Sequence, residues 1–315
     1  MLVLVVGVTG NIGQKLIPSL RRRGHQVRGL GRNPQKLPRE LHDQLESFVT
    51  SKTYWDIPAM EAACAGTVDA VINTYPGSPE LTVEAQMLLL RAAERAGVRV
   101  FVASTWNYDW RGLTVGMHES YDPYLLFRRQ VELTAPKIKP IYILSGVLAE
   151  VFFGAPEYPH WTAKNHGAWN PNPDDGKNGA KAIEYWGDPD LKWYWTSEAD
   201  AAEFAAAIVE RPNAADGGFW TVCSGVHSLP EIAETYSRVR GVEVTLRRKG
   251  SVEELRHQAL EARRLSHPSR FLEYIGWFYM LHTVDNTWTL GEVENGNLGV
   301  QGTSMEDFLR ANVHI

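Results

Sequence analysis

The stretch that decides the fold is Met1–Gly13, MLVLVVGVTGNIG, at the start of the chain. Five apolar residues, Leu2–Val6, are followed directly by glycines in the spacing GxxGxxG, at Gly7, Gly10 and Gly13. An unbroken apolar run predicts a strand that is buried on both faces, as in a parallel sheet. The apolar spacing of the next residues predicts a helix. The order of strand, glycine turn and helix indicates a dinucleotide site.

Such a glycine turn is suited to bind a pyrophosphate. One glycine permits the tight turn, a second lets the phosphates approach the backbone, and a third lets helix and strand pack closely. The helix N-terminus offers free N–H groups and a partial positive charge. The alternative is a turn whose glycines serve backbone geometry alone. On the first interpretation, the cofactor contacts Gly7, Thr9, Gly10, Asn11, Ile12 and Gly13.

The residues after the second predicted strand, His25–Leu30, indicate which nucleotide is bound. An acidic residue there bonds the ribose 2′-hydroxyl of NAD, whereas an arginine accommodates the 2′-phosphate of NADP. Arg32 follows the strand, Lys36 lies four residues later, and no acidic residue stands between them. The sequence therefore predicts NADP(H) in preference to NAD(H), and the alternative is a solvated surface arginine.

Strands and helices alternate through the first half of the chain. Val68–Asn73, Val98–Ala103 and Ile141–Ser145 are predicted strands, and Leu81–Gly97 is a predicted helix. This alternation predicts an α/β fold with a Rossmann-type, doubly wound parallel sheet. Ligands of such sheets lie across the carboxyl ends of the strands. We therefore expect further cofactor contacts from Asn73, Thr74, Tyr75, Ser104, Thr105, Ser145 and Gly146.

The second half predicts a smaller C-terminal α/β lobe that binds the substrate. We expect an NADP(H)-binding domain over residues 1–153, with some later strands returning to its sheet, and a substrate lobe over 154–315. Gly154–Gly179 is rich in proline, asparagine and aspartate, which predicts a lid or a disordered loop. Eleven tryptophans, many of them in this half, indicate an aromatic-lined cavity, although each one is also a candidate core residue. The predicted substrate contacts are Trp106, Tyr108, Phe152 and Trp161.

The composition excludes several classes of protein. The 315 residues are 44% hydrophobic and 22% charged, as in ordinary globular proteins, and the net charge of −5 provides no basic surface for nucleic acid. No apolar run reaches the length of a membrane span. The two cysteines, Cys64 and Cys223, exclude a disulfide framework and a cysteine-rich zinc site. We expect a cytoplasmic monomer or homodimer that binds a small molecule, without a metal, nucleic-acid or membrane partner.

Several segments in order resemble one family. They are GVTGNIG (7–13), GLGRNP (29–34), AAERAGVRVFVAST (92–105), GDPDLKWYWTSEADAAEFAAAIV (187–209) and TSMEDFLRA (303–311). This pattern resembles the NmrA-like family of atypical short-chain dehydrogenases/reductases, whose neighbours include the isoflavone, phenylcoumaran benzylic ether and pinoresinol reductases. The resemblance covers nearly the whole chain and implies a Rossmann domain with NADP(H) and a small substrate lobe. The family includes NADPH-dependent reductases of aromatic and polyketide-like secondary metabolites, and also nucleotide-sensing regulators without catalysis.

Reduction by NADPH requires a proton donor as well as a hydride. Many short-chain dehydrogenases use a serine with Tyr-x-x-x-Lys. Here Ser104 ends a strand, and Tyr124 and Arg128 hold the i and i+4 positions of a predicted helix, on one face. Arg128 keeps its charge and could bind a ribose or phosphate, but it is a bulkier, planar group. The lysine that the ether and isoflavone reductases carry early on this helix is absent. His118, in the preceding loop, which should face the crevice, is a second candidate acid.

Three functions are consistent with these residues. The first is an NADP(H)-dependent reductase of an aromatic or polyketide-type molecule, in which Tyr124 with Ser104, or His118, handles the proton. The second is an NADP(H)-sensing regulatory protein without catalysis. The third is a non-redox isomerase, dehydratase or cyclase that uses the same crevice.

Overall fold

The large sheet of the molecule has seven parallel strands, in the order β11-β6-β5-β4-β1-β2-β3. The computed structural model describes residues 1–158, 167–173 and 180–315. The predicted α/β fold with a doubly wound parallel sheet is confirmed. The strands are β1 (Leu2–Val6), β2 (Gln26–Gly31), β3 (Ser47–Thr50), β4 (Val68–Asn73), β5 (Val100–Val102), β6 (Pro140–Leu144) and β11 (Gly218–Thr221).

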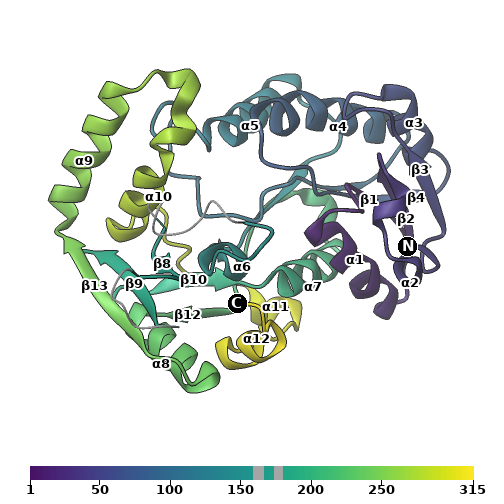
Figure 1. The fold of residues 1–315 in the computed structure, drawn as a ribbon. Coiled ribbons are helices and arrows are strands. Elements are labelled where there is room, and N and C mark those ends of the chain that lie inside the picture. Colours follow the sequence, from purple (N-terminus) through teal and green to yellow (C-terminus); the bar gives the residue numbers. More distant parts are fainter. Residues whose placement is uncertain (159–166, 174–179) are drawn as a thin grey trace.

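Helices cover both faces of this sheet (Figure 1). The side chains of Val3 and Val5 pack in one core with the helices α1 and α7, whereas Leu2, Leu4 and Val6 pack in a second core with α3, α4 and α5. This alternation explains why every residue of β1 is apolar, because both faces of the strand are buried. The helices are α1 (Asn11–Arg22), α2 (Arg39–His42), α3 (Ile57–Cys64), α4 (Gln86–Arg95), α5 (Asp122–Thr134) and α7 (Glu198–Val209).

The glycine turn lies where the strand order reverses, between β1 and β4. Gly7 has a φ of +78°, and a Cβ atom there would lie 2.7 Å from the hydroxyl oxygen of Thr74. A Cβ atom on Gly13 would lie 2.4 Å from the carbonyl oxygen of Gly7. Thr74 in turn donates from its amide and its hydroxyl to the carbonyl of Val6, at 2.9 and 2.8 Å. The turn is therefore packed too closely for side chains at these glycines.

A smaller lobe follows in the chain and contains two three-stranded sheets, β12-β10-β7 and β13-β9-β8. The 3₁₀ helix Pro268–Glu273 precedes α10. Strand β11 and helix α7 belong to the second half of the chain, but they join the large sheet and its helix layer. The remaining elements are β7 (Val147–Leu148), α6 (Ala149–Phe152), β8 (Trp169–Asn170), β9 (Lys181–Trp186), β10 (Trp193–Thr196), β12 (Gly225–His227), α8 (Leu229–Arg240), β13 (Val244–Gly250), α9 (Val252–Leu265), α10 (Ile275–Val284), α11 (Asn295–Leu298) and α12 (Met305–Ala311).

Element boundaries differ from the predictions by a few residues. The predicted helix Leu81–Gly97 is divided into a π turn, Leu81–Ala85, and the α-helix α4. The predicted strand Val98–Ala103 is shorter, because only the residues of β5 pair regularly with β4. The predicted lid Gly154–Gly179 lies partly outside the described residues, and its described part includes β8.

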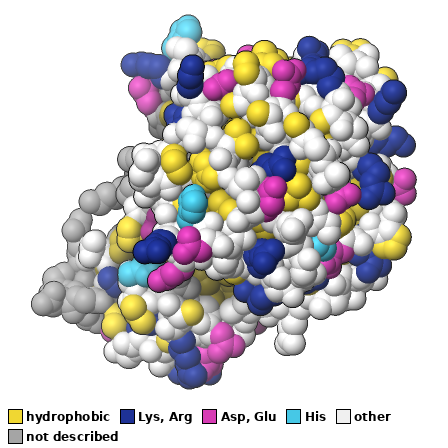
Figure 2. All heavy atoms as spheres, turned by 90° about the vertical axis from the view of Figure 1, so that its right-hand side faces the viewer, with side chains coloured by type: hydrophobic (Ala, Val, Ile, Leu, Met, Phe, Trp, Pro, Cys, Tyr) yellow, Lys and Arg dark blue, Asp and Glu magenta, His cyan; other side chains and the backbone are white. Residues whose placement is uncertain are grey.

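The charged side chains are mixed on the face that carries α2, α3 and β3. Figure 2 shows Lys and Arg side chains interspersed there with Asp and Glu, with hydrophobic groups between them. None of the helices in the described ranges is long and apolar enough to cross a membrane.

Candidate functional site

A cavity of about 410 Å³ lies at the carboxyl ends of β1, β2, β3 and β4. Two cations, Arg32 and Lys36, line it, and no acidic residue is among the described residues that do so. The predicted contacts Gly7, Thr9, Gly10, Thr74 and Tyr75 also line it. The full lining is Gly7, Thr9, Gly10, Leu30, Gly31, Arg32, Asn33, Lys36, Ser51, Tyr54, Thr74, Tyr75 and Pro76. We refer to it as the nucleotide cavity.

The glycine turn fits a phosphate group at one end of this cavity. Helix α1 begins after Gly10 without a side-chain cap, so its first N–H groups are open to an anion. Asn11 points elsewhere, because its side-chain amide donates to the hydroxyl of Tyr158 at 3.2 Å. Ile12 and Gly13 are not among the described lining residues, and Gly13 serves the packing of the helix on the turn.

Six lining residues were not predicted as contacts: Leu30, Gly31, Asn33, Ser51, Tyr54 and Pro76. Ser51 follows β3, and its amide extends the ladder by donating to the carbonyl of Gly31 at 3.0 Å. Tyr54 accepts a hydrogen bond from the guanidinium of Arg32, over 2.7 Å from Nη2 to the hydroxyl oxygen. The position of Ser51 directly after a strand of a parallel sheet is a signal that could have identified it.

Two predicted contacts, Asn73 and Thr105, are buried and hold the backbone instead. The side-chain amide of Asn73 donates to Gln86 at 2.8 Å, and its oxygen accepts the amide of Tyr75 at 3.2 Å. The hydroxyl of Thr105 accepts the amide of Ile143 at 2.8 Å. Neither residue is among the described residues that line a cavity at this edge of the sheet.

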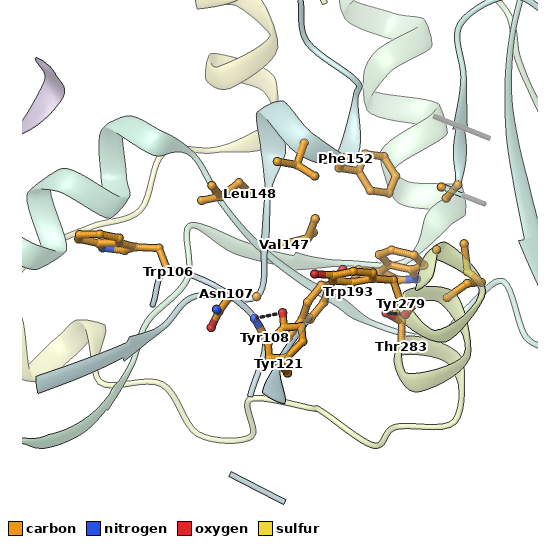
Figure 3. Close-up of a pocket in the computed structure, with 16 residues that line it drawn as sticks. Trp106, Asn107, Tyr108, Tyr121, Val147, Leu148, Phe152, Trp193, Tyr279 and Thr283 are labelled. Carbon is orange, nitrogen blue, oxygen red and sulfur yellow. Dashed lines mark hydrogen bonds between the residues drawn. The ribbon is translucent and has the colours of Figure 1, made fainter. Parts of the chain in front are cut away.

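A second cavity, of about 180 Å³, has mostly apolar and aromatic walls (Figure 3). Trp106, Tyr108 and Phe152 line it, as predicted for substrate contacts, whereas Trp161 lies outside the described residues. We refer to it as the aromatic cavity. Its lining is Trp106, Asn107, Tyr108, Tyr121, Gly146, Val147, Leu148, Val151, Phe152, Gly167, Ala168, Trp193, Gly276, Tyr279, Met280 and Thr283.

Gly146 lies in the wall of the aromatic cavity and not in that of the nucleotide cavity. Its φ is +68°, and a Cβ atom there would lie 2.2 Å from the carbonyl oxygen of Tyr194. The neighbouring Ser145 is buried, and its carbonyl accepts the hydroxyl of Thr196 at 2.6 Å. This pair of residues therefore joins the large sheet to β10.

Three aromatic residues of the cavity were not predicted: Tyr121, Trp193 and Tyr279. They come from the start of α5, from β10 and from α10. In Figure 3, Tyr121 lies beside Tyr108, and the dashed line marks the bond from the amide of Tyr108 to the hydroxyl of Tyr121, at 3.3 Å. Only the tertiary fold brings these distant segments together, so no local pattern indicated them.

Ser104 and Tyr124 are not among the described residues that line either cavity, but each hydrogen-bonds to a residue that does. The hydroxyl of Ser104 donates to the carbonyl of Tyr75, a nucleotide-cavity residue, at 2.7 Å. The hydroxyl of Tyr124 lies close to Gly77, since a Cβ atom there would be 2.8 Å from it, and it hydrogen-bonds to Asn107 of the aromatic cavity. Burial raises the pKa of Tyr124, while the bond to Asn107 opposes that rise. The phenol therefore holds its proton at neutral pH.

Arg128 does not join Tyr124 in these contacts. Its Nε donates to the carboxylate of Glu132 at 3.0 Å, and its guanidinium carbon lies 5.2 Å from the ring centroid of Phe219. Arg128 is not among the described residues that line either cavity. The structure thus keeps the expected helix spacing but does not bring the two side chains to one reacting group.

His118 is buried, contrary to the expectation of a loop histidine that faces the crevice. Its ring is surrounded by Tyr121, Tyr279, His282 and Trp288, with ring centroids 4.5 to 5.5 Å away. Neither ring nitrogen has a hydrogen-bond partner among the described residues. Burial, with smaller contributions from His282 and Arg263, lowers the pKa of His118 well below its usual value. The imidazole is therefore neutral and lies behind the cavity wall.

No cluster of three His, Cys, Asp or Glu side chains in the described part of the chain could hold a metal ion. Cys64 and Cys223 are both free thiols, and both are buried. Burial raises the pKa of Cys64 to about 12 and that of Cys223 to about 11, so both thiols remain protonated.

Comparison with known proteins identifies the family. The model of the NmrA-like family matches residues 1–287. The chain belongs to the NmrA-like family. A bifunctional pinoresinol-lariciresinol reductase of Linum usitatissimum is 25% identical over 218 residues, which are 66% of this chain and 64% of the relative. A 3-beta-hydroxysteroid dehydrogenase of Mycolicibacterium neoaurum is 31% identical over 118 residues, 33% of this chain and 32% of the relative. This match spans about a third of the dehydrogenase.

Solved structures share the fold of this NmrA-like protein over nearly its whole length. The leucoanthocyanidin reductase of Vitis vinifera, in a binary complex with NADPH, superposes with a TM-score of 0.71 at 17% identity. The superposition covers 99% of both chains. The likeness therefore extends to the smaller lobe as well as to the dinucleotide domain.

Proposed function

We propose that this NmrA-like protein is an NADP(H)-dependent reductase that acts on an aromatic or polyketide-type small molecule. The proposal depends on one observation: two cavities of opposite character lie at one edge of the sheet. The nucleotide cavity carries Arg32 and Lys36, and the described residues around it include no acid. The aromatic cavity is lined mostly by apolar and aromatic side chains. A charged cofactor and a ring-containing substrate fit these two environments.

The nucleotide cavity would hold NADP(H), which supplies a hydride when it is bound. Gly7 and Gly10 leave the backbone open to phosphate, and Arg32 and Lys36 would neutralise a 2′-phosphate. The grape reductase of the same fold was solved with NADPH, which supports this choice. Planar aromatic walls would bind a ring system by offset stacking and edge contacts.

Tyr124 is our candidate for the proton donor. Its phenol is protonated at neutral pH, and it adjoins both Gly77 and Asn107. Ser104 already donates its hydroxyl proton to the carbonyl of Tyr75, so we assign it a positioning role. His118 receives no role in the proposal, because it is neutral and enclosed behind Tyr121 and Tyr279.

The test combines binding with turnover. Calorimetric titration with NADPH, NADP⁺, NADH and NAD⁺ should show preferential binding of the two phosphorylated nucleotides. A panel of aromatic ketones, quinones and benzylic ethers is then screened for loss of NADPH absorbance. We expect the protein to consume one mole of NADPH for each mole of substrate that it reduces by two electrons. Failure to bind any nucleotide would refute the proposal, and product formation without NADPH consumption would favour an isomerase, dehydratase or cyclase.

A nucleotide sensor without catalysis is the second candidate. It is favoured by Arg128, which pairs with Glu132 and leaves Tyr124 without the cation that usually accompanies a catalytic tyrosine. A sensor should bind NADPH and NADP⁺ with different affinities, yet consume no NADPH with any member of the panel. Equal affinities for the two redox forms would argue against this candidate.

A further inference from the structure

Arg32 is exposed, yet its side chain is held in place. An exposed arginine normally samples many rotamers, and ordering it on a ligand costs conformational entropy. A residue that orders it beforehand lowers that cost and raises affinity without contributing a new contact to the ligand. Whatever holds Arg32 would therefore influence how strongly the nucleotide cavity prefers a phosphate.

Tyr54 holds Arg32 by two contacts at once. The guanidinium carbon lies 4.0 Å from the centroid of the Tyr54 ring, which is the geometry of a cation–π contact. Its Nη2 also donates to the hydroxyl of the same tyrosine, at 2.7 Å. The two contacts together hold the guanidinium against the side chain of Tyr54.

Tyr54 is itself fixed from its other side. Its ring meets that of Tyr75 edge-on, with centroids 5.2 Å apart and planes at 84°. The loop that carries it is closed by Asp56, whose carboxylate accepts the amides of Lys52 at 2.8 Å and Ala59 at 3.2 Å. These backbone hydrogen bonds lower the pKa of Asp56, so the closure persists at neutral pH. Arg32 thus contacts an aromatic ring that is itself held in place by its neighbours.

We propose that Tyr54 is a positioning residue that holds the Arg32 guanidinium at the nucleotide cavity and so sets the preference for a 2′-phosphorylated over an unphosphorylated adenosine nucleotide. This inference rests on the proposed function only in taking the cavity to be a nucleotide site. All three side chains of the arrangement, Arg32, Tyr54 and Tyr75, line that cavity.

The test compares Tyr54→Phe with the wild type. Phenylalanine retains the ring that stacks on Arg32 but removes the hydroxyl that accepts its hydrogen bond. Calorimetry would measure the affinity for adenosine 2′,5′-bisphosphate and for adenosine 5′-monophosphate, which differ at the 2′ position. We expect Tyr54→Phe to weaken binding of the bisphosphate by up to about tenfold, the cost of ordering one long side chain on binding. Binding of the monophosphate should change less than twofold.

A double-mutant cycle shows whether Tyr54 acts through Arg32. In the Arg32→Ala background, Tyr54→Phe should have almost no further effect on the bisphosphate affinity, because the group that it positions is gone. Lys52→Ala is the control, since it removes a cation from the same loop that is not among the described lining residues. This control should leave the ratio of the two affinities unchanged.

Each outcome is decisive for the inference. An unchanged affinity ratio in Tyr54→Phe overturns it, and so does an equal loss for both ligands, which would indicate a merely structural role. An undiminished effect in the Arg32→Ala background would show that Tyr54 acts independently of Arg32. If the wild type binds neither ligand nor NADPH, the proposed function itself fails, and that result is distinguishable from the others.

Discussion

Both carboxylate oxygens of Glu150 accept the backbone N–H of Glu198, each at 3.1 Å from the nitrogen. Glu198 is the first residue of α7, so Glu150 satisfies one of the free N–H groups at that helix end. Both side chains are buried, and the Glu198 carboxylate pairs with Nζ of Lys15 at 2.7 Å. Desolvation, followed by the charge of Glu198, raises the pKa of Glu150 to about 7. This contact therefore links stability to pH.

Replacing Glu150 with glutamine should stabilise the protein at high pH. Because its folded-state pKa is raised, Glu150 favours the fold fully below its unfolded pKa of about 4.5, and this contribution is lost as the pH rises through about 7. We expect Glu150→Gln to raise the free energy of unfolding at pH 8 by up to about 3 kcal/mol. At pH 5 the gain should be under about 1 kcal/mol, since wild-type Glu150 is then largely protonated in the fold.

Urea unfolding at pH 5 and pH 8 measures this difference. Glu253→Gln is the matched control, because the side chain of Glu253 is 87% exposed and its removal should change neither value appreciably. A gain for Glu150→Gln that is the same at both pH values would show that glutamine merely packs better, and that Glu150 does not titrate as inferred.

Gly146→Ala should destabilise the protein and disturb the aromatic cavity. The added Cβ would lie 2.2 Å from the carbonyl oxygen of Tyr194, and the φ of +68° disfavours any side chain. Strain and overpacking together should cost about 2–5 kcal/mol of unfolding free energy. Gly241→Ala is the control for strain alone, because Gly241 has a φ of +66° with nothing within 4 Å of its added Cβ.

Thermal and urea unfolding of both variants check this prediction. Gly241→Ala should lose only about 1–2 kcal/mol. If Gly146→Ala lowers the free energy of unfolding by no more than Gly241→Ala does, the contact between Gly146 and the carbonyl of Tyr194 is less tight than in this structure.

Much of the fold could be predicted from the sequence, because short runs of apolar residues and glycines indicate individual strands, turns and helices. The apolar run Leu2–Val6 and the glycines after it predicted β1, the turn and α1. The strand Val68–Asn73 was predicted with its observed bounds. The π turn at the start of the predicted helix Leu81–Gly97 could not be predicted, because the segment is rich in residues that favour helices. We expected some later strands to return to this sheet, but the pairing of β11 with β6 joins residues far apart in the chain, and no local pattern indicates which strands pair.

The site was predictable only where it follows a strand of the parallel sheet. Arg32, Thr74 and Ser104 lie at strand ends, and the rule that ligands bind there places them at this edge. Tyr121, at the start of α5, and Tyr279, on α10, meet at the aromatic cavity only through the packing of helices that are distant in the sequence. The complete burial of His118 depends on the same packing, so its chemistry could not be inferred from a polar loop.

Arg32→Ala should convert a preference for NADPH into near equality between NADPH and NADH. Loss of a charge-assisted contact to a phosphate costs about 1.5–3 kcal/mol, or roughly 10- to 150-fold in NADPH affinity. The affinity for NADH, which lacks the 2′-phosphate, should change little. Calorimetric titration at fixed ionic strength measures both values.

Arg39→Ala is the control for this change. Arg39 lies in the nearby helix α2, and its side chain is 94% exposed. Its removal takes away the same formal charge without touching the described lining of the nucleotide cavity. A similar loss of NADPH affinity in both variants would mean that general electrostatic attraction, and not contact with Arg32, favours the phosphate.

Tyr124→Phe should abolish most turnover while the cofactor still binds. The change removes the proton that the buried phenol holds but retains the ring packed against Trp110, 6.1 Å away between centroids. Loss of a general acid typically lowers kcat about 10²- to 10⁴-fold. The NADPH affinity should change less than about twofold, because Tyr124 is not among the described residues that line the nucleotide cavity. Tyr185→Phe, on β9, is the control and should retain full activity, because Tyr185 is not among the described residues that line either cavity. Steady-state rates with any substrate found in the panel, together with calorimetry, separate the two quantities. Undiminished kcat in Tyr124→Phe would remove Tyr124 from the chemistry. It would direct attention to Tyr121, which directly precedes α5 and lines the aromatic cavity.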